Sequence, residues 1–181
     1  ERQDNHRMVG NVYKGKVENV LPGMQAAFVD IGYDLNAFLP FSEIANPDYI
    51  IEDDSRQNKK NKTKSDNIEV DLQTNQEIFV QVIKEPFAGK GPRVTTEVAL
   101  PGRLLVLVPY ENYIGISKKI WDKFERRRLK KIAKTLRQKD IGIIIRTVAE
   151  GKSEEHIVND FKSLLTSWNK VSKIAENQEA P

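Results

Sequence analysis

The sequence has no cysteine, and it has only two histidines, His6 and His156. Without cysteine there can be no disulfide framework and no thiolate metal site. The two histidines are far apart and lack the spacing of metal ligands. No apolar run approaches the ~20 residues that a membrane-spanning helix needs. We therefore expect a soluble, intracellular protein without a membrane span or a metal site of its own.

The termini carry no targeting pattern, and the first residue is Glu1 rather than Met. We therefore expect the sequence to be a trimmed piece of a longer chain. At 181 residues and 39% hydrophobic content, it can bury the core of one or two small domains.

Charge is unevenly distributed along the chain. The formal net charge is only +3, but residues 118–139 contain 11 basic and two acidic residues, which leaves 18 basic and 24 acidic residues elsewhere. Such asymmetry favours a polyanionic partner. Apolar residues recur at helical spacing in this segment, so we expect a basic helix with a buried stripe and a largely solvated charged face. The predicted stripe is Trp121, Phe124, Leu129, Ile132, Ala133 and Leu136.

Residues 10 to about 90 have the pattern of a small β-barrel, with short β-prone runs separated by Gly and Pro turns. Residues 53–67 contain no apolar side chain and indicate a mobile, basic surface loop. The predicted strands are Val12–Val20, Gln25–Ile31, Ala37–Phe41 and Glu77–Lys84.

The pattern changes after the Gly89–Pro92 break. Two apolar strands, Leu104–Val108 and Ile141–Ile145, flank the basic helix, and a second helix follows. Ser153 is the expected N-cap of that helix, with acidic residues in its first turn. The fold class is therefore α+β, a barrel joined to a small mixed α/β subdomain.

Two phenylalanines have an unusual place in the strand alternation. Ala27, Val29 and Ile31 share one face, so Phe28 lies with Asp30 on the other. Phe38 is likewise opposite Leu39. Outward phenylalanines among lysines would form a stacking platform for single-stranded nucleic acid. The alternative is that both rings belong to the core, where Phe is common.

Several motifs resemble the S1 RNA-binding domain, an OB-fold, and more narrowly the RNase E/G endoribonucleases. The resemblance runs from about Val9 to about Trp168. In the first part it rests on 11–17, 25–32, 37–40 and 42–44, and in the second on 91–96, 100–103, 108–109, 115–120 and 145–149.

The resemblance implies three parts. Residues 1–10 would be the remnant of an RNase H-like region, 11–91 an S1 domain containing the 53–67 loop, and 92–181 a sensor of the RNA 5′-monophosphate. Single-stranded RNA would contact five residues of the S1 domain. These are Lys14, Phe28, Phe38, Lys84 and Lys90.

The sensor would be a phosphate pocket formed by Gly102, Val106, Arg146 and Thr147. Arg146 follows an apolar strand, and a guanidinium can hold phosphate oxygens bidentately. Taken without the resemblance, an Arg at this position is more often a solvated residue in a turn. Lys118 and Lys119 lie within a matching motif and are possible further RNA contacts.

The family's chemistry is Mg²⁺-assisted phosphodiester hydrolysis by paired aspartates in a downstream nuclease domain, with a Cys-x-x-Cys zinc link between subunits. We expect neither here, because cysteine is absent, Asp30 stands alone and Asp53-Asp54 begins the predicted loop. No catalytic residue is predicted in the chain, and the fragment alone is expected to be inactive.

The full-length enzyme would be an oligomer that acts in mRNA decay and rRNA processing, in the bacterial cytoplasm or in a plastid. Two alternatives stay open: a stand-alone S1-type RNA-binding protein without nuclease activity, and a second part that binds other proteins.

Overall fold

The computed structural model describes residues 7–44 and 70–181. Contacts divide the chain into unit 1, Glu1–Val98 with Glu179–Pro181, and unit 2, Ala99–Gln178. The predicted loop at 53–67 and most of the predicted remnant at 1–10 lie outside the described residues.

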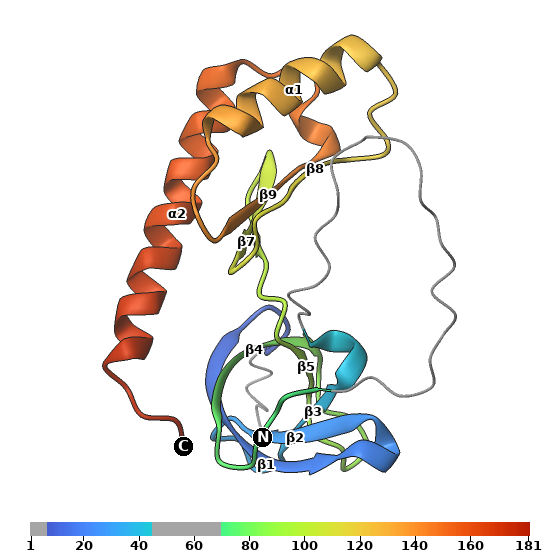
Figure 1. Ribbon diagram of the computed structural model, residues 1–181, viewed down its shortest axis with the longest axis vertical. Coiled ribbons are helices and arrows are strands. Elements are labelled where there is room, and N and C mark those ends of the chain that lie inside the picture. Colours follow the sequence, from blue (N-terminus) through green and yellow to red (C-terminus); the bar gives the residue numbers. More distant parts are fainter. Residues whose placement is uncertain (1–6, 45–69) are drawn as a thin grey trace, which may run out of the picture. The chain divides into compact units, whose positions relative to one another are not determined.

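Unit 1 contains a closed five-stranded barrel with the strand order β1-β2-β3-β5-β4 (Figure 1). Neighbouring strands are antiparallel except β3 and β5, which are parallel. Short 3₁₀ turns at Pro22–Met24 and Phe41–Glu43 follow β1 and β3. The strands are β1 (Val12–Leu21), β2 (Ala26–Asp30), β3 (Ala37–Pro40), β4 (Glu77–Lys84) and β5 (Arg93–Thr95).

The barrel core follows from the two-residue alternation of its strands. Val29, Leu39, Val80 and Val94 are fully buried, one from each of four strands. The four predicted strands coincide with β1 to β4 to within one residue at each end. The expected α+β class with an OB-type barrel is confirmed.

The last barrel strand lies beyond the predicted boundary of the S1 domain at residue 91. β5 pairs with β4 and touches β3 at Phe38–Arg93, so it closes the barrel. The contact division falls seven residues later, between Val98 and Ala99. A three-residue strand directly after Gly91-Pro92 has too little local pattern to be recognised in the sequence.

Unit 2 contains a four-stranded sheet with the order β6-β7-β9-β8 and two helices (Figure 1). β7 is antiparallel to β6 and β9, and β8 is parallel to β9. A 3₁₀ turn, Thr147–Ala149, follows β9. The elements are β6 (Leu100–Pro101), β7 (Leu105–Pro109), β8 (Ile114–Ile116), α1 (Lys123–Thr135), β9 (Ile141–Ile145) and α2 (Glu154–Glu176).

The core of unit 2 lies between the sheet and its helices. Leu105, Leu107, Ile143 and Ile145 alternate along β7 and β9 and are fully buried. Helix α2 packs against β6 and β7, and α1 packs against β8 and β9. Among the residues that the structure describes, no helix has the length and apolar character needed to cross a membrane.

The predicted buried stripe of α1 is wrong at its first two positions. Leu129, Ile132 and Ala133 are buried, whereas Trp121 and Phe124 are exposed. The helix begins only at Lys123, after its N-cap. The helical period therefore does not extend back to Trp121, and the first turn of the helix leaves Phe124 exposed.

Helix α2 begins where the sequence predicts, with Ser153 at the N-cap position and two glutamates in the first turn. The Ser153 hydroxyl makes a 2.8 Å hydrogen bond with His156 Nδ1 instead of capping a backbone N–H. Ile157, Phe161 and Trp168 form the buried side of the helix.

Candidate nucleic-acid interface

Four side chains form a continuous row across the outside of the barrel. Phe28 on β2 is the direct register partner of Phe38 on β3, which is paired with Arg93 on β5. Arg93 is in turn paired with Lys84 on β4. Directly paired residues point to the same side of a sheet. We call Phe28, Phe38, Arg93 and Lys84 the cross-barrel row.

The two rings of the row are outside the core. Their neighbours along the strands, Ala27, Val29 and Leu39, are fully buried, whereas Phe28 and Phe38 are half-buried. The ring centroids are 5.8 Å apart, with the planes at 61°. The prediction of outward phenylalanines is confirmed, and the core alternative is wrong.

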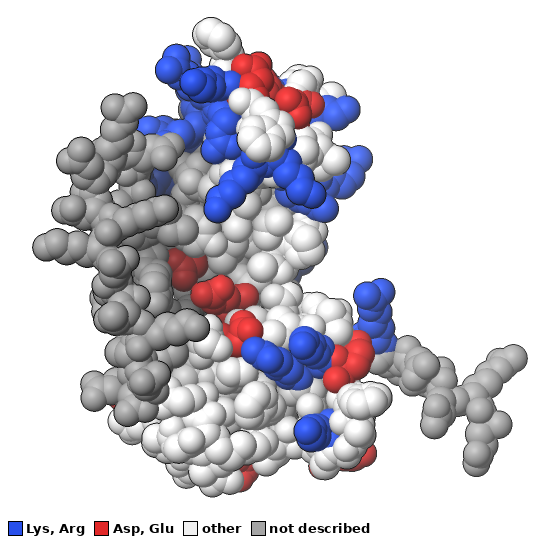
Figure 2. Space-filling model, turned by 90° about the vertical axis from the view of Figure 1, so that its right-hand side faces the viewer, with Lys and Arg blue, Asp and Glu red and all other residues white. Residues whose placement is uncertain are grey.

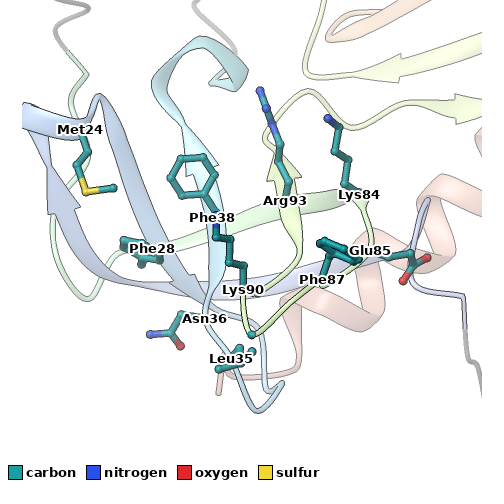
Figure 3. A pocket seen from close by; sticks show the side chains of 12 residues that line it. Met24, Phe28, Leu35, Asn36, Phe38, Lys84, Glu85, Phe87, Lys90 and Arg93 are labelled. Atoms are coloured by element: carbon teal, nitrogen blue, oxygen red, sulfur yellow. The ribbon is translucent and has the colours of Figure 1, made fainter. Parts of the chain in front are cut away.

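The cross-barrel row lines a groove of about 730 Å³ (Figure 3). Phe87 and Lys90 lie at its rim, where they exchange two backbone hydrogen bonds of 3.1 and 3.0 Å across a two-residue turn. Both turn residues, Ala88 and Gly89, have positive φ, the geometry of a tight hairpin turn. The turn therefore holds an aromatic ring and a cation side by side, and Phe87 is 82% exposed.

The groove is lined by Lys84, Lys90 and Arg93 against Glu85, and Arg93 Nη2 also forms a 3.1 Å ion pair with Glu43 Oε1. The Glu85 carboxylate accepts two backbone N–H groups, of Met8 and Val9, at 2.9 Å each. These bonds partly compensate its charge. The groove therefore combines three aromatic rings with three cations, which suits a flexible polyanion with planar groups.

Lys14, a predicted RNA contact, is not among the residues that line this groove. Its ammonium group lies 2.7 Å from Glu77 Oε2. The hydrogen bond from Lys14 is the main reason that the pKa of Glu77 is lowered. The structure thus brings Phe28, Phe38, Lys84 and Lys90 together and leaves Lys14 apart from them.

A second arrangement of polar groups lies at one edge of the unit 2 sheet. The parallel strands β8 and β9 end there, at Ile116 and Ile145, and β7 starts there. Arg146 follows β9, and its guanidinium donates to the Gly102 carbonyl at 2.5 Å. The Thr147 hydroxyl makes a 2.9 Å hydrogen bond with the Ser117 hydroxyl. Three of the four predicted sensor residues therefore meet at this edge.

Val106 occupies the adjacent position on β7. It is paired with Ile144 and Pro101, and it is half-buried on the face opposite to the helices. Its side chain thus gives an apolar border one residue from the edge, since its neighbour Leu105 is paired with Ile145 at the strand end.

Asp160 of α2 shapes the turn that contains Gly102. Its carboxylate accepts the backbone N–H groups of Arg103, Leu104 and Leu105 at 3.3, 2.8 and 3.3 Å. A Cβ on Gly102 would lie 2.6 Å from Asp160 Oδ2, so the close approach requires glycine. Neither Asp160 nor Ser117 was found from the sequence, because each acts through a contact with a residue at least 30 positions away.

Lys118 and Lys119 are exposed directly after Ser117. The Lys119 backbone N–H donates to the Ser117 hydroxyl at 3.3 Å. These two cations are therefore tied to the edge that carries Thr147 and Arg146.

Within residues 7–44 and 70–181, no three His, Cys, Asp or Glu side chains gather as a possible metal site. Asp30 caps its own turn, since its carboxylate accepts the Gly32 N–H at 2.8 Å. Asp53-Asp54 lies outside the described residues. Asp30 is therefore engaged in a turn and does not gather with other carboxylates of the described residues.

Each of the two units matches a family of known proteins. Residues 7–95 match the model of the S1 RNA binding domain, and residues 99–181 match that of the Ribonuclease E/G family. The chain is 43% identical over 171 residues to Ribonuclease G of Salmonella typhimurium, covering 94% of the chain and 34% of that protein. It is 37% identical over 177 residues to Ribonuclease E of Nostoc sp., covering 97% of the chain and 24% of that protein. A Ribonuclease E/G-like protein of Pyropia yezoensis is 36% identical over 176 residues, covering 97% of the chain and 32% of that protein. The chain thus spans between about a quarter and a third of the length of these relatives.

Proposed function

The chain belongs to the ribonuclease E/G family, and we propose that it is the part of such an enzyme that captures single-stranded RNA and senses its 5′-monophosphate. The whole protein would be an endoribonuclease of RNA processing and decay, Mg²⁺-dependent and oligomeric. The bacterial relatives support a cytoplasmic site of action, with a plastid as the alternative. The match over residues 99–181 favours this function over that of a stand-alone S1-type RNA-binding protein.

RNA capture is assigned to the groove of unit 1. Bases would stack on Phe28 and Phe38, while Lys84 and Lys90 neutralise phosphates. Arg93 would contribute less, since its ion pair with Glu43 competes with phosphate. Stacking on aromatic side chains is worth ~1–3 kcal/mol per base and tolerates any base, because every base has a π-face. Lys14 would contribute more weakly, since the ion pair with Glu77 competes with phosphate.

Sensing is assigned to the edge of the unit 2 sheet, and the meeting of Arg146, Gly102 and Thr147 there is the observation that carries it. One Nη of Arg146 is used by the Gly102 carbonyl, which orients the guanidinium and leaves its other N–H groups for phosphate oxygens. The Thr147 hydroxyl adds a donor, and Val106 borders the pocket.

The test compares one single-stranded RNA with a 5′-monophosphate or a 5′-hydroxyl end, titrated against the chain by fluorescence anisotropy. We expect tighter binding of the monophosphate and loss of this preference in Arg146→Ala. A charged hydrogen bond is worth roughly 1.5–3 kcal/mol, so the preference should be about 10- to 100-fold. Arg137→Ala, which removes an exposed cation elsewhere, should retain it.

Sensing at this edge would be contradicted if wild type bound both ends equally. It would also be contradicted if Arg146→Ala weakened both RNAs by the same factor, because that is the behaviour of a general phosphate contact. The affinity for the 5′-hydroxyl RNA tests RNA capture by the groove separately, because this RNA has no 5′-phosphate for the sensor to bind.

A further inference from the structure

Two aromatic side chains at the start of α1 project into solvent. Trp121 is 86% exposed and Phe124 is 79% exposed, and Trp121 is the most exposed large apolar side chain in the described part of the chain. Neither lines the groove of unit 1 or belongs to the sensor edge. Large exposed apolar groups that lie close together can mark interaction sites, so these two neighbouring rings indicate a candidate binding surface.

The local structure explains why these rings stay outside. Asp122 caps the helix by accepting the Phe124 N–H at 2.9 Å, which places Trp121 just before the helix. A hydrophobic residue there often packs on the fourth helical residue, but that residue is Arg126. The Arg126 guanidinium is held by the Ser117 and Ile120 carbonyls at 2.8 and 3.3 Å. The backbone that carries Trp121 is therefore fixed while the ring has no apolar partner on the helix.

The surroundings of the two rings are strongly basic. Lys118, Lys119, Lys123 and Arg127 are all exposed nearby in the chain. Figure 2 shows Lys and Arg side chains gathered on the end of unit 2 that carries α1, with few acidic side chains among them.

The two acidic residues of the 118–139 segment, Asp122 and Glu125, both make hydrogen bonds within the chain. Asp122 is engaged in the helix cap. Glu125 is held by two hydrogen bonds from Arg128, of 2.7 and 2.6 Å, and one from the Gly151 N–H at 2.9 Å. Both carboxylates are thus committed to contacts within the chain, and the four exposed cations outnumber them.

We propose that Trp121 and Phe124, with Lys118, Lys119, Lys123 and Arg127, form a second single-stranded RNA site, which we call the α1 platform. A base stacks on the Trp121 indole, and the cations bind the flanking phosphates. The proposal rests on the proposed function for the identity of the polymer, but its two rings, Lys123 and Arg127 have no part in the groove or the sensor.

The arrangement selects against other anionic partners. A duplex keeps its bases stacked on each other and offers no free base face. A membrane-bound amphipathic helix needs an apolar face along its length. Here the later apolar residues of α1, Leu129, Ile132 and Ala133, are buried within unit 2, so only the first turn offers aromatic surface. Single-stranded RNA combines separate planar groups with closely spaced phosphates, which matches two rings among four cations.

The intrinsic fluorescence of Trp121 can report RNA binding at the α1 platform. The chain has two tryptophans, and Trp168 is only 5% exposed and packs edge-on against Tyr110 at 5.7 Å. The probe is a 12-nucleotide oligouridylate with a 5′-hydroxyl end, which does not engage the sensor. It is titrated against wild type and against the Phe28→Ala/Phe38→Ala variant, in which the groove is impaired.

We expect this RNA to quench tryptophan emission in both proteins, and to leave the emission of Trp121→Ala unchanged. Trp121→Ala should lose about 5- to 100-fold in affinity for a single stacked base, and Trp121→Phe should retain most of the affinity. Lys123→Gln with Arg127→Gln should lower the salt dependence of binding. Ile174→Ala, an exposed apolar residue on α2, should bind as wild type does.

The proposal is overturned if the RNA leaves the emission of wild type unchanged, or if Trp121→Ala binds as wild type does. An equal response to a duplex of the same length, or to phosphatidylglycerol vesicles alone, would also overturn it. None of these results would contradict RNA binding by the groove of unit 1. That binding would be contradicted if the Phe28→Ala/Phe38→Ala variant bound RNA with the affinity of wild type.

Discussion

Phe28 and Phe38 are direct register partners on β2 and β3, and their rings meet edge to face on the outside of the barrel, 5.8 Å apart. Neither ring contributes to the fully buried core, which is formed by neighbours such as Val29 and Leu39. The pair can therefore be removed with a modest loss of stability, which makes its role in binding measurable.

We expect Phe28→Ala to weaken the binding of any single-stranded RNA by about 5- to 100-fold, the equivalent of one stacked base. The loss should be similar for uridine-rich and adenosine-rich RNA, because stacking has little base preference. Anisotropy titrations at fixed salt measure both. Val29→Ala, a core change one residue away, should instead lower the melting temperature. A Phe28→Ala variant that binds normally but melts early would assign the ring to stability.

Phe87 should extend the stacking surface at the rim of the groove. The hairpin turn holds it beside Lys90, and the ring is almost fully in solvent. Phe87→Ala should therefore weaken RNA binding by about 5-fold or more without changing the melting temperature. Tyr33→Ala removes an exposed ring that does not line the groove and is the matched control. Equal affinities of these two variants would exclude Phe87 from the interface.

The positions found from the sequence are those fixed by short-range pattern. The outward orientation of Phe28 and Phe38 follows from alternation within strands of four or five residues. The position of Arg146 at the end of an apolar strand follows from the strand pattern as well, and both features depend only on neighbours in the chain. The assignment of Arg146 to a phosphate pocket instead rests on the resemblance to the RNase E/G family.

The positions that sequence reasoning missed depend on distant contacts. Arg93 joins the cross-barrel row because β5 lies parallel to β3, a pairing that joins residues 55 positions apart. The sequence pattern places Trp121 in the core because it extends the helical period back past the N-cap Asp122, where the helix begins. The period alone does not tell which turns of a helix lie over the sheet.

Gly102 should tolerate no side chain. An alanine Cβ would lie 2.6 Å from Asp160 Oδ2 and 2.8 Å from Leu164 Cδ1. We expect Gly102→Ala to displace the turn, cost about 1–3 kcal/mol of stability and reduce the preference for 5′-monophosphate RNA. Chemical denaturation and the paired RNA titration measure the two effects. Gly23→Ala, where no atom lies within 4 Å of the added Cβ, should be nearly neutral in both. A stable Gly102→Ala variant with normal preference would place the pocket elsewhere.

Glu125 should make the stability of unit 2 depend on acid pH. The hydrogen bonds from Arg128, and then that from the Gly151 N–H, lower the pKa of Glu125 from 4.5 to about 2. Because the folded pKa lies below the unfolded value, the stabilisation is complete above about pH 4.5 and is lost as the pH falls through about 2. Glu125→Gln should cost about 1–2 kcal/mol at pH 7.

The cost of Glu125→Gln should shrink between pH 5 and pH 3. The carboxyl group of the unfolded wild-type chain takes up a proton below about pH 4.5, whereas in the folded protein it stays ionised until about pH 2. Urea denaturation of both proteins at several pH values measures the difference. Glu150→Gln removes an exposed carboxylate next to Gly151 and should show no such trend. A cost of Glu125→Gln that is the same at pH 7 and pH 3 would mean that the carboxylate does not stabilise the first turn of α1.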